Sequence, residues 1–129
     1  MAFSRDTPIY SQIADDIRRQ ILECTARAGD RLLSTTEYAA TYRINPATAA
    51  KAFNILEAEG LVEKRRGLGV YVTESAHAVL LERRRSRFYD DVVVPCVAEG
   101  YRLGLTIDEV LAAVARAAEH LSEKDTTHE

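Results

Sequence analysis

The chain has 129 residues, a length that fits one full domain with an appendage and excludes two large domains. Apolar residues make up 47% and charged residues 29%, which excludes a disordered or collagen-like chain. The net charge of −3 argues mildly against nucleic-acid binding. However, residues 1–73 carry ten Lys/Arg against nine Asp/Glu and residues 74–129 carry seven against eleven, so the acidic excess belongs to the C-terminal part.

The sequence lacks the marks of an exported or membrane-bound protein. No apolar run approaches the twenty residues of a membrane span, and charged residues interrupt any signal-peptide core within the first thirty residues. Cys24 and Cys96 lie far apart and form no CxxC pair, so we expect them to be reduced and structural. We therefore expect a cytoplasmic protein.

A first helix is predicted from Thr7, which can cap the open backbone amides, with Pro8 at the first helical position. Isoleucines recur at every fourth position over residues 9–21 and form a stripe that faces a core. The helix should end near Cys24, before a turn over residues 28–30.

Two helices joined by a tight turn are predicted next. The first runs from a capping box at Ser34 and Glu37 into a turn over residues 42–45. The pair Asn45-Pro46, an N-cap followed by proline, starts the second helix, and Gly60 ends it. Two helices of this length with so short a turn are a helix-turn-helix candidate.

After Gly60 the apolar period changes from 3.6 residues to 2, which predicts a β-hairpin. Residues 61–65 and 70–73 are its expected strands, and residues 66–69, with two glycines, are its turn. The tip is basic. A helix, a helix-turn-helix and a basic hairpin together predict a winged helix-turn-helix.

The C-terminal part is predicted to be helical. A long amphipathic helix is expected over residues 75–103, kinked or interrupted at Pro95 and closed by Gly104. A second capping box at Thr106 and Glu109 begins the last helix. The apolar stripe of that helix consists of Val110, Leu111, Val114, Ala118 and Leu121.

The expected fold class is mostly α with a small β-hairpin. Residues 1–74 are predicted to form a winged helix-turn-helix DNA-binding domain, and residues 75–129 a two-helix C-terminal segment.

The second helix of a helix-turn-helix lies in the DNA major groove, with its N-terminal residues at the base edges. Asn45 can read adenine, while the methyl groups of Ala47 and Thr48 can touch thymine methyls. Lys51 can reach a guanine edge or a phosphate, and Arg66 can enter the minor groove from the hairpin tip. Helix starts also present open amides to phosphates. The candidate DNA-binding residues are Ser34, Thr35, Thr36, Asn45, Pro46, Ala47, Thr48, Lys51, Lys64, Arg65, Arg66 and Gly67.

Plainer interpretations of these patterns stay open. Helix-turn-helix spacing also occurs by chance in all-α proteins, and winged helices also serve as protein-binding modules. The basic tip over residues 64–66 can be only a solvated turn. The arginine run over residues 83–87 can contact phosphates, but such a run more often covers a solvated helix face.

Short segments along residues 7–73 match a known family pattern: Pro8–Ala14, Gly29–Leu32, Ser34 with Glu37 and Ala39, Ile44–Thr48, Ala52–Phe53, Leu56–Glu57, Glu59–Val62 and Arg65–Val72. In this order they resemble the GntR family of transcriptional regulators, and most of all its small YtrA subfamily. The likeness is looser through residues 103–106 and the last helix.

The resemblance implies a homodimeric repressor on a palindromic operator, often beside a transporter operon, with dimerisation through the C-terminal helices. Simple physics agrees, because two amphipathic helices have too few partners to bury their apolar faces alone. Pairing around a two-fold axis buries these faces and places two recognition helices on a symmetric site. The short C-terminal segment argues against the larger effector domains of other GntR subfamilies.

Three positions depart from the family pattern. Leu33 stands where proline usually follows the strand leucine. Thr36 and Ala50 stand where arginines contact DNA in family members, which removes two guanidinium forks for guanine. We therefore expect an operator that differs from the common family site, or phosphate contacts that carry more of the affinity.

Other functions have less support in the sequence. His77, His120 and His128 lack metal-ligand spacing, so no metal and no cofactor are predicted. No catalytic Ser/His/Asp or Cys/His arrangement and no phosphate loop are found, so we predict that the protein is not an enzyme. The competing function is a winged-helix protein-interaction module that binds DNA weakly or not at all. The threonine at position 36 and the acidic net charge favour it slightly.

A small-molecule effector is a further prediction. Such a ligand can bind between the dimerisation helices and the DNA-binding domains and shift their orientation. Tyr89, Tyr101 and Arg102 are candidates to line the site, or they serve packing and solubility.

Overall fold

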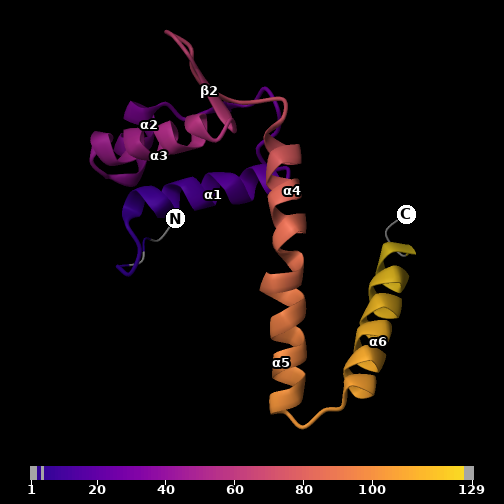
Figure 1. The fold of residues 1–129 in the computed structure, drawn as a ribbon. Coiled ribbons are helices and arrows are strands. Elements are labelled where there is room, and N and C mark those ends of the chain that lie inside the picture. Colours follow the sequence, from indigo (N-terminus) through magenta and orange to yellow (C-terminus); the bar gives the residue numbers. More distant parts are fainter. Residues whose placement is uncertain (1–2, 4, 127–129) are drawn as a thin grey trace. The chain divides into compact units, whose positions relative to one another are not determined.

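The computed structural model describes residue 3 and residues 5–126 (Figure 1). The elements are α1 (Ile9–Leu22), β1 (Arg31–Leu32), α2 (Thr35–Tyr42), α3 (Pro46–Ala58), β2 (Val62–Arg65), β3 (Gly69–Val72), α4 (Ala76–Phe88), the π-helix η1 (Tyr89–Val93), α5 (Val94–Arg102) and α6 (Ile107–Thr126). They form two compact units, residues 1–84 and residues 85–129. No helix in the described ranges is long and apolar enough to cross a membrane.

One hydrophobic core organises the N-terminal unit, in which α1 and α2 both pack against α3 (Figure 1). Ile13, Ile17 and Ile21 of α1 are at most 2% exposed and join the fully buried Phe53 of α3. The predicted isoleucine stripe is confirmed from its second member onward, since Ile9 is 38% exposed. Each such buried side chain contributes about 1.5–3 kcal/mol of transfer free energy.

The start of α1 differs from the prediction. Pro8, in an extended conformation, is itself the N-cap, and no side chain caps the helix. Thr7 therefore lies one residue too early to cap the open amides, and its carbonyl oxygen accepts a hydrogen bond from the Gln12 side chain at 2.7 Å. The helix ends at Leu22, before Cys24 adopts the left-handed conformation with a φ of 63°.

The helix-turn-helix forms as predicted. Ser34 Oγ accepts a hydrogen bond from Glu37 N at 3.1 Å and caps α2. Asn45 Oδ1 accepts one from Ala47 N at 2.8 Å and caps α3, which has proline at its first position. Between the helices, Arg43 reverses the chain in the left-handed conformation, with a φ of 53° and a ψ of 50°.

The predicted hairpin is part of a three-stranded antiparallel sheet with the order β1-β3-β2. Val62 pairs with Val72, and Arg65 pairs with Gly69 beside the turn. The third strand, β1, is only two residues long, too short for an alternating pattern, and it contains the strand leucine Leu32 that the family pattern implied. In Figure 1 the hairpin extends away from the helices of its unit.

The expected long helix over residues 75–103 consists of two α-helical segments, α4 and α5, with the π-helix η1 between them. Ala76 and Leu80, in the first turns of α4, are buried in the core of the N-terminal unit. The five residues Tyr89–Val93 form a π-helix immediately before Pro95. Proline lacks an amide and clashes with the carbonyl four residues earlier, so a wider turn at this point accommodates it. The predicted interruption is confirmed.

The C-terminal unit contains a close contact between α5 and α6. Gly100 of α5 is buried, and a Cβ atom at this position would lie 2.6 Å from Val110 Cγ2. The second capping box forms in both directions: Glu109 N donates to Thr106 Oγ1 and Thr106 N donates to Glu109 Oε1, both at 3.2 Å. Glycine and the capping box therefore fix the start of α6 against α5.

Few hydrophobic side chains are buried in the C-terminal unit. Among its described residues, Val110 is the one buried large hydrophobic side chain, at 5% exposure. The exposed ones include Phe88, Tyr89, Val92, Val94, Tyr101, Leu103, Ile107, Leu111, Val114 and Leu121. The apolar stripe predicted for the last helix is therefore largely uncovered in a single chain.

Candidate nucleic-acid interface

The N-terminal ends of α2 and α3 present the residues that were predicted to meet DNA. Thr36 is exposed in the first turn of α2, while Thr35 is half-buried. Asn45, Pro46 and Ala47 are exposed at the start of α3. The first amides of each helix carry partial positive charge, which attracts phosphate oxygens. Both helix starts are thus available for contacts to the DNA backbone.

The capping role of Asn45 limits what its side chain can read. Bidentate recognition of adenine uses the side-chain oxygen and the side-chain amide together. In the structure Oδ1 already accepts the hydrogen bond from Ala47 N. The Nδ2 group is thus the part of Asn45 best placed to donate to DNA.

Lys51 lies one turn further along α3 and is exposed. Its Nζ is 4.0 Å from the centroid of the Tyr10 ring of α1. Such an exposed cation–π contact is worth about 0.5–1 kcal/mol, which a phosphate or a guanine edge can replace. The contact therefore holds Lys51 in place without preventing its predicted role.

Two of the three basic residues at the hairpin tip interact with other side chains, and the third has no partner among the described residues. Lys64 donates to Asn54 Oδ1, and Arg65 pairs with Glu63 at 2.7 Å while its guanidinium lies 4.2 Å from the centroid of the Tyr71 ring. Arg66 is exposed and has no interaction partner among the described residues. It is therefore the tip residue with the most freedom to enter a groove, and its contact with DNA stays a prediction.

Arg31, which sequence reasoning did not single out, connects the hairpin to α2. Its Nε donates to the carbonyl oxygen of Leu68 in the hairpin turn at 3.1 Å, and its Nη2 donates to Glu37 Oε1 at 2.8 Å. The hydrogen bond from this guanidinium holds the pKa of Glu37 below its usual value. The hairpin and the first turn of α2 are thus fastened to each other. No sequence pattern signals a contact between residues 37 positions apart.

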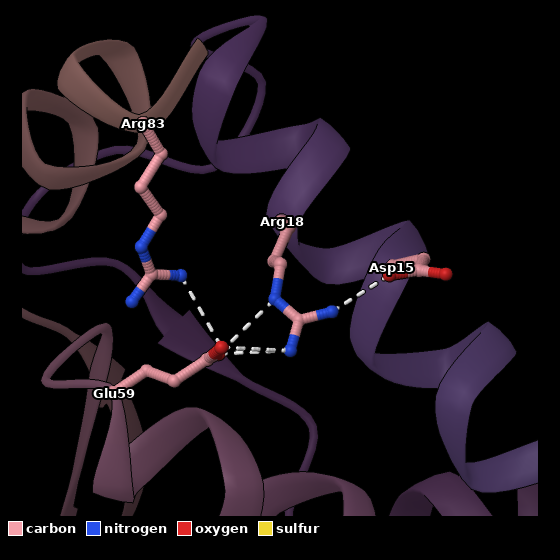
Figure 2. A network of polar contacts seen from close by, with 4 residues as sticks. All are labelled: Asp15, Arg18, Glu59 and Arg83. Carbon is pink, nitrogen blue, oxygen red and sulfur yellow. Dashed lines mark hydrogen bonds and ion pairs between the residues drawn. The ribbon is translucent and has the colours of Figure 1, made fainter. Parts of the chain in front are cut away.

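A partly buried charge network holds the other end of α3 (Figure 2). Glu59, the C-cap of α3, accepts hydrogen bonds from Arg18 Nη2 at 2.9 Å and from Arg83 Nη1 at 3.2 Å. Figure 2 also shows Arg18 paired with Asp15, and the nearest nitrogen and oxygen of the two side chains are 2.7 Å apart. One carboxylate therefore ties α3 to α1 and to the first part of α4, and Arg83 has a structural contact within its run of arginines.

Aromatic packing fixes α2 against α3. The rings of Tyr38 and Phe53 meet edge to face at 5.8 Å, and the Tyr42 ring lies 4.5 Å from that of Tyr38. The Tyr38 hydroxyl is buried with no hydrogen-bond partner among the described residues, and burial raises the pKa of this side chain. The angle between the two helices is thus set by side chains that are removed from solvent.

The residues proposed for an effector site are exposed. Tyr89 is 67% exposed and Tyr101 is 58% exposed, while Arg102 pairs with Glu99 at 2.8 Å. These residues belong to η1 and α5.

The cysteines and histidines form no metal site in the described ranges. Cys24 and Cys96 are free and exposed, so neither packs in a core as a structural cysteine would. The described residues contain no group of three or more His, Cys, Asp or Glu side chains that could hold a metal ion. His128 lies outside the residues that the structure describes.

Known proteins similar to the chain are bacterial regulators. Residues 9–72 match the family of bacterial regulatory proteins called the gntR family. The chain is 33% identical to the HTH-type transcriptional regulator YhcF of Bacillus subtilis, over 87% of its own length and 91% of that protein. It is also 41% identical to the HTH-type transcriptional repressor YtrA of the same organism, over 59% of its own length and 58% of that protein.

A solved structure extends the similarity to the fold. A GntR family transcriptional regulator from Listeria monocytogenes superposes with a TM-score of 0.69 at 30% identity, over 88% of this chain and 98% of the other. The predicted fold class is confirmed by this similarity. Because these relatives are transcriptional regulators, the prediction that the chain is not an enzyme is also confirmed.

Proposed function

The chain belongs to the GntR family of bacterial regulatory proteins and is a DNA-binding transcriptional regulator, and from this premise we propose that it is a homodimeric repressor acting on a palindromic operator. The observation that carries the proposal is a winged helix-turn-helix with a complete core, joined to helices whose apolar side chains are left exposed. The first part is equipped to read DNA, and the second needs a partner.

Residues 1–74 are proposed to read the operator. The exposed start of α3 enters the major groove, with Lys51 one turn further along, and Arg66 enters the adjacent minor groove from the hairpin. The amides at the start of α2, with Ser34 and Thr36, bind phosphate. Because Thr36 and Ala50 cannot form guanidinium forks, phosphate contacts carry a larger share of the affinity.

Residues 75–129 are proposed to pair two chains around a two-fold axis. Leu111, Val114 and Leu121 of α6 are 54–61% exposed, and helical spacing places them on one face. Burying this stripe in a symmetric interface stabilises the dimer by about 25 cal/mol for each Å² of apolar surface removed from water. The same symmetry presents two reading surfaces to a palindrome, so that the affinities of two half-sites combine.

Repression and a transporter-type operon are the finer parts of the proposal. The relative that is 41% identical over part of the chain is named a transcriptional repressor, which supports repression. The type of operon rests on the resemblance to the YtrA subfamily alone. A footprint on the DNA beside the gene, with the functions of the flanking genes, tests both.

The experiment for DNA reading compares three single substitutions by gel shift on the duplex that the footprint defines. Lys51→Ala and Arg66→Ala should each weaken binding by about fivefold to tenfold, because each removes one cationic contact per protomer. Arg116→Ala, on α6, is the matched control and should bind as the unchanged protein does. Unchanged binding of both Lys51→Ala and Arg66→Ala would reject this placement of the reading surface.

Salt dependence separates operator reading from the competing function, a winged-helix protein-interaction module. A protein that binds phosphates releases counterions, so its affinity for DNA falls steeply as salt rises. We expect a loss of at least about a hundredfold between 50 and 200 mM salt for a dimer with several phosphate contacts per subunit. An affinity that is weak and independent of salt would favour the interaction module.

A small-molecule effector stays a prediction. Melting the protein across a panel of metabolites tests it, because a ligand that binds the folded state raises the melting temperature. A flat response across the panel would remove its main support.

A further inference from the structure

The cations of the reading segment differ in how strongly they are engaged within the protein. Between residues 34 and 67, all of which the structure describes, the chain carries five Lys and Arg side chains. Lys51 stacks on Tyr10, and Lys64 and Arg65 bond to neighbours of the hairpin. Arg43 and Arg66 have no interaction partner among the described residues. Arg66 already has a predicted role, whereas nothing so far explains Arg43.

Arg43 occupies a backbone conformation that its side chain does not favour. It is one of two non-glycine residues with positive φ in the described part of the chain, and the other is Cys24. The left-handed conformation brings Cβ close to the following carbonyl, so glycine is the residue best suited to this position. An arginine here costs stability, and its side chain makes no hydrogen bond, ion pair or ring contact with the described residues that would compensate for this cost. Its side chain is therefore best explained by a contact outside the chain.

The position of Arg43 in the fold indicates what that contact is. The residue is exposed in the turn between α2 and α3, two residues before the N-cap Asn45. Its Cα therefore lies within about 7 Å of the N-cap's Cα. A cation at this point stands beside the open amides of α3, where a phosphate of the bound duplex is expected.

We infer that the guanidinium of Arg43 binds a DNA phosphate beside the start of α3 and thereby positions the reading helix. The inference rests on the proposed function, in which α3 enters the major groove. Thr36 and Ala50 cannot supply a guanidinium on the same two helices, so Arg43 provides one from the turn between them. A phosphate contact carries no sequence preference, so Arg43 raises affinity for all sequences alike.

The strained backbone allows a test in which stability and binding change in opposite directions. Arg43→Gly removes both the guanidinium and the strain, so its melting temperature should rise by about 2–5 °C. Its affinity for DNA should fall by about fivefold to tenfold for each protomer, with a smaller slope of log affinity against log salt. Arg43→Lys keeps the positive charge, so its slope of log affinity against log salt should equal that of the unchanged protein.

Cys24→Gly is the matched control. Cys24 has the same left-handed conformation and is exposed, but it follows α1 and does not adjoin α2 or α3. Its glycine variant should gain similar stability and bind DNA as the unchanged protein does. Fluorescence anisotropy with a labelled random-sequence duplex of about 40 base pairs measures binding, since both α3 helices of a dimer, one helical turn of DNA apart, can contact a duplex of this length.

Three outcomes decide the inference. Weaker binding of Arg43→Gly, with its stability raised and Cys24→Gly unaffected, supports it. Equal binding by the unchanged protein, Arg43→Gly and Cys24→Gly overturns it and leaves the proposed function standing. If the unchanged protein binds neither this duplex nor the DNA beside its own gene at about 50 mM salt, the proposed function fails and the inference falls with it.

Discussion

The two units of the chain differ in how many of their hydrophobic side chains they bury. In residues 1–84, side chains from α1, α2, α3, the start of α4 and a small sheet meet in one core, and Phe53 and Leu56 of α3 are fully buried. In residues 85–126, Val110 alone among the large hydrophobic side chains is buried, and Leu111 beside it is 58% exposed. The first unit completes its fold within one chain. The second has the sequence of amphipathic helices but lacks the layer that would cover them.

This difference in burial assigns DNA binding to one unit of the chain and pairing with a second chain to the other. Because the N-terminal unit needs no partner for its core, its surface is free for DNA. Because the C-terminal unit leaves most of its large apolar side chains exposed, a second chain is expected to cover them.

The largest expected effect is in the N-terminal core. Phe53→Ala removes a fully buried ring that packs edge to face on Tyr38, so it should lower the free energy of unfolding by about 3–5 kcal/mol. Urea denaturation followed by circular dichroism measures the loss. DNA binding should fail as the unit unfolds. A loss below about 1 kcal/mol would mean that this core is not the one that stabilises the unit.

The next effect concerns the face of α6. Leu111→Glu places two charges in a symmetric interface and should raise the dimer dissociation constant by about a hundredfold, as sedimentation velocity would show. Ala112→Glu, on the other side of the same helix, is the matched control and should leave the dimer intact. Equal behaviour of the two variants would contradict pairing through this face.

A smaller effect is expected at the contact between α5 and α6. Gly100→Ala puts a methyl group 2.6 Å from Val110 Cγ2, so the helices must move apart at a cost of about 1–3 kcal/mol. Adding Val110→Ala makes room for the methyl group and should recover part of the loss, which thermal melting would measure. If the double variant melts below Gly100→Ala, the close approach of the two helices is not the cause.

The smallest effect is the titration of Glu37. Arg31 holds the pKa of this carboxyl below its usual value, chiefly through a hydrogen bond. A lowered pKa stabilises the folded state at pH above the unfolded value, and this stability is lost as pH falls through the folded value. Arg31→Gln should therefore raise the pKa of Glu37 towards its usual value, as a carbon-detected NMR titration would show. An unchanged pKa would mean that Arg31 does not fasten the hairpin to α2.

Local signals predicted much of this fold. The caps at Ser34, Asn45 and Thr106 were readable from residue types at short spacing, because a cap joins atoms within three residues of each other. The isoleucine stripe predicted the core because apolar residues four positions apart lie on one face of a helix. Thr7 was placed as a cap one residue too early, since a proline serves either as the cap or as the first helical residue.

Contacts between distant residues were not readable from the sequence. Arg31 meets Leu68, and Glu59 joins Arg18 to Arg83, only because the fold brings separate elements together. The candidate DNA-binding residues were placed by the helix-turn-helix pattern, but their internal partners were not. In the structure Lys64 and Arg65 bond to other side chains, whereas Arg43 and Arg66 have no side-chain partner among the described residues.

The mass of the protein in solution tests the central claim, a symmetric pair of chains that reads DNA, most directly. Light scattering on the full chain should give twice the 14.4 kDa of one chain. With the footprinted duplex, two chains should bind to each palindrome. A mass of one chain that persists from about 1 to 100 μM protein, and one chain for each duplex, would contradict the account.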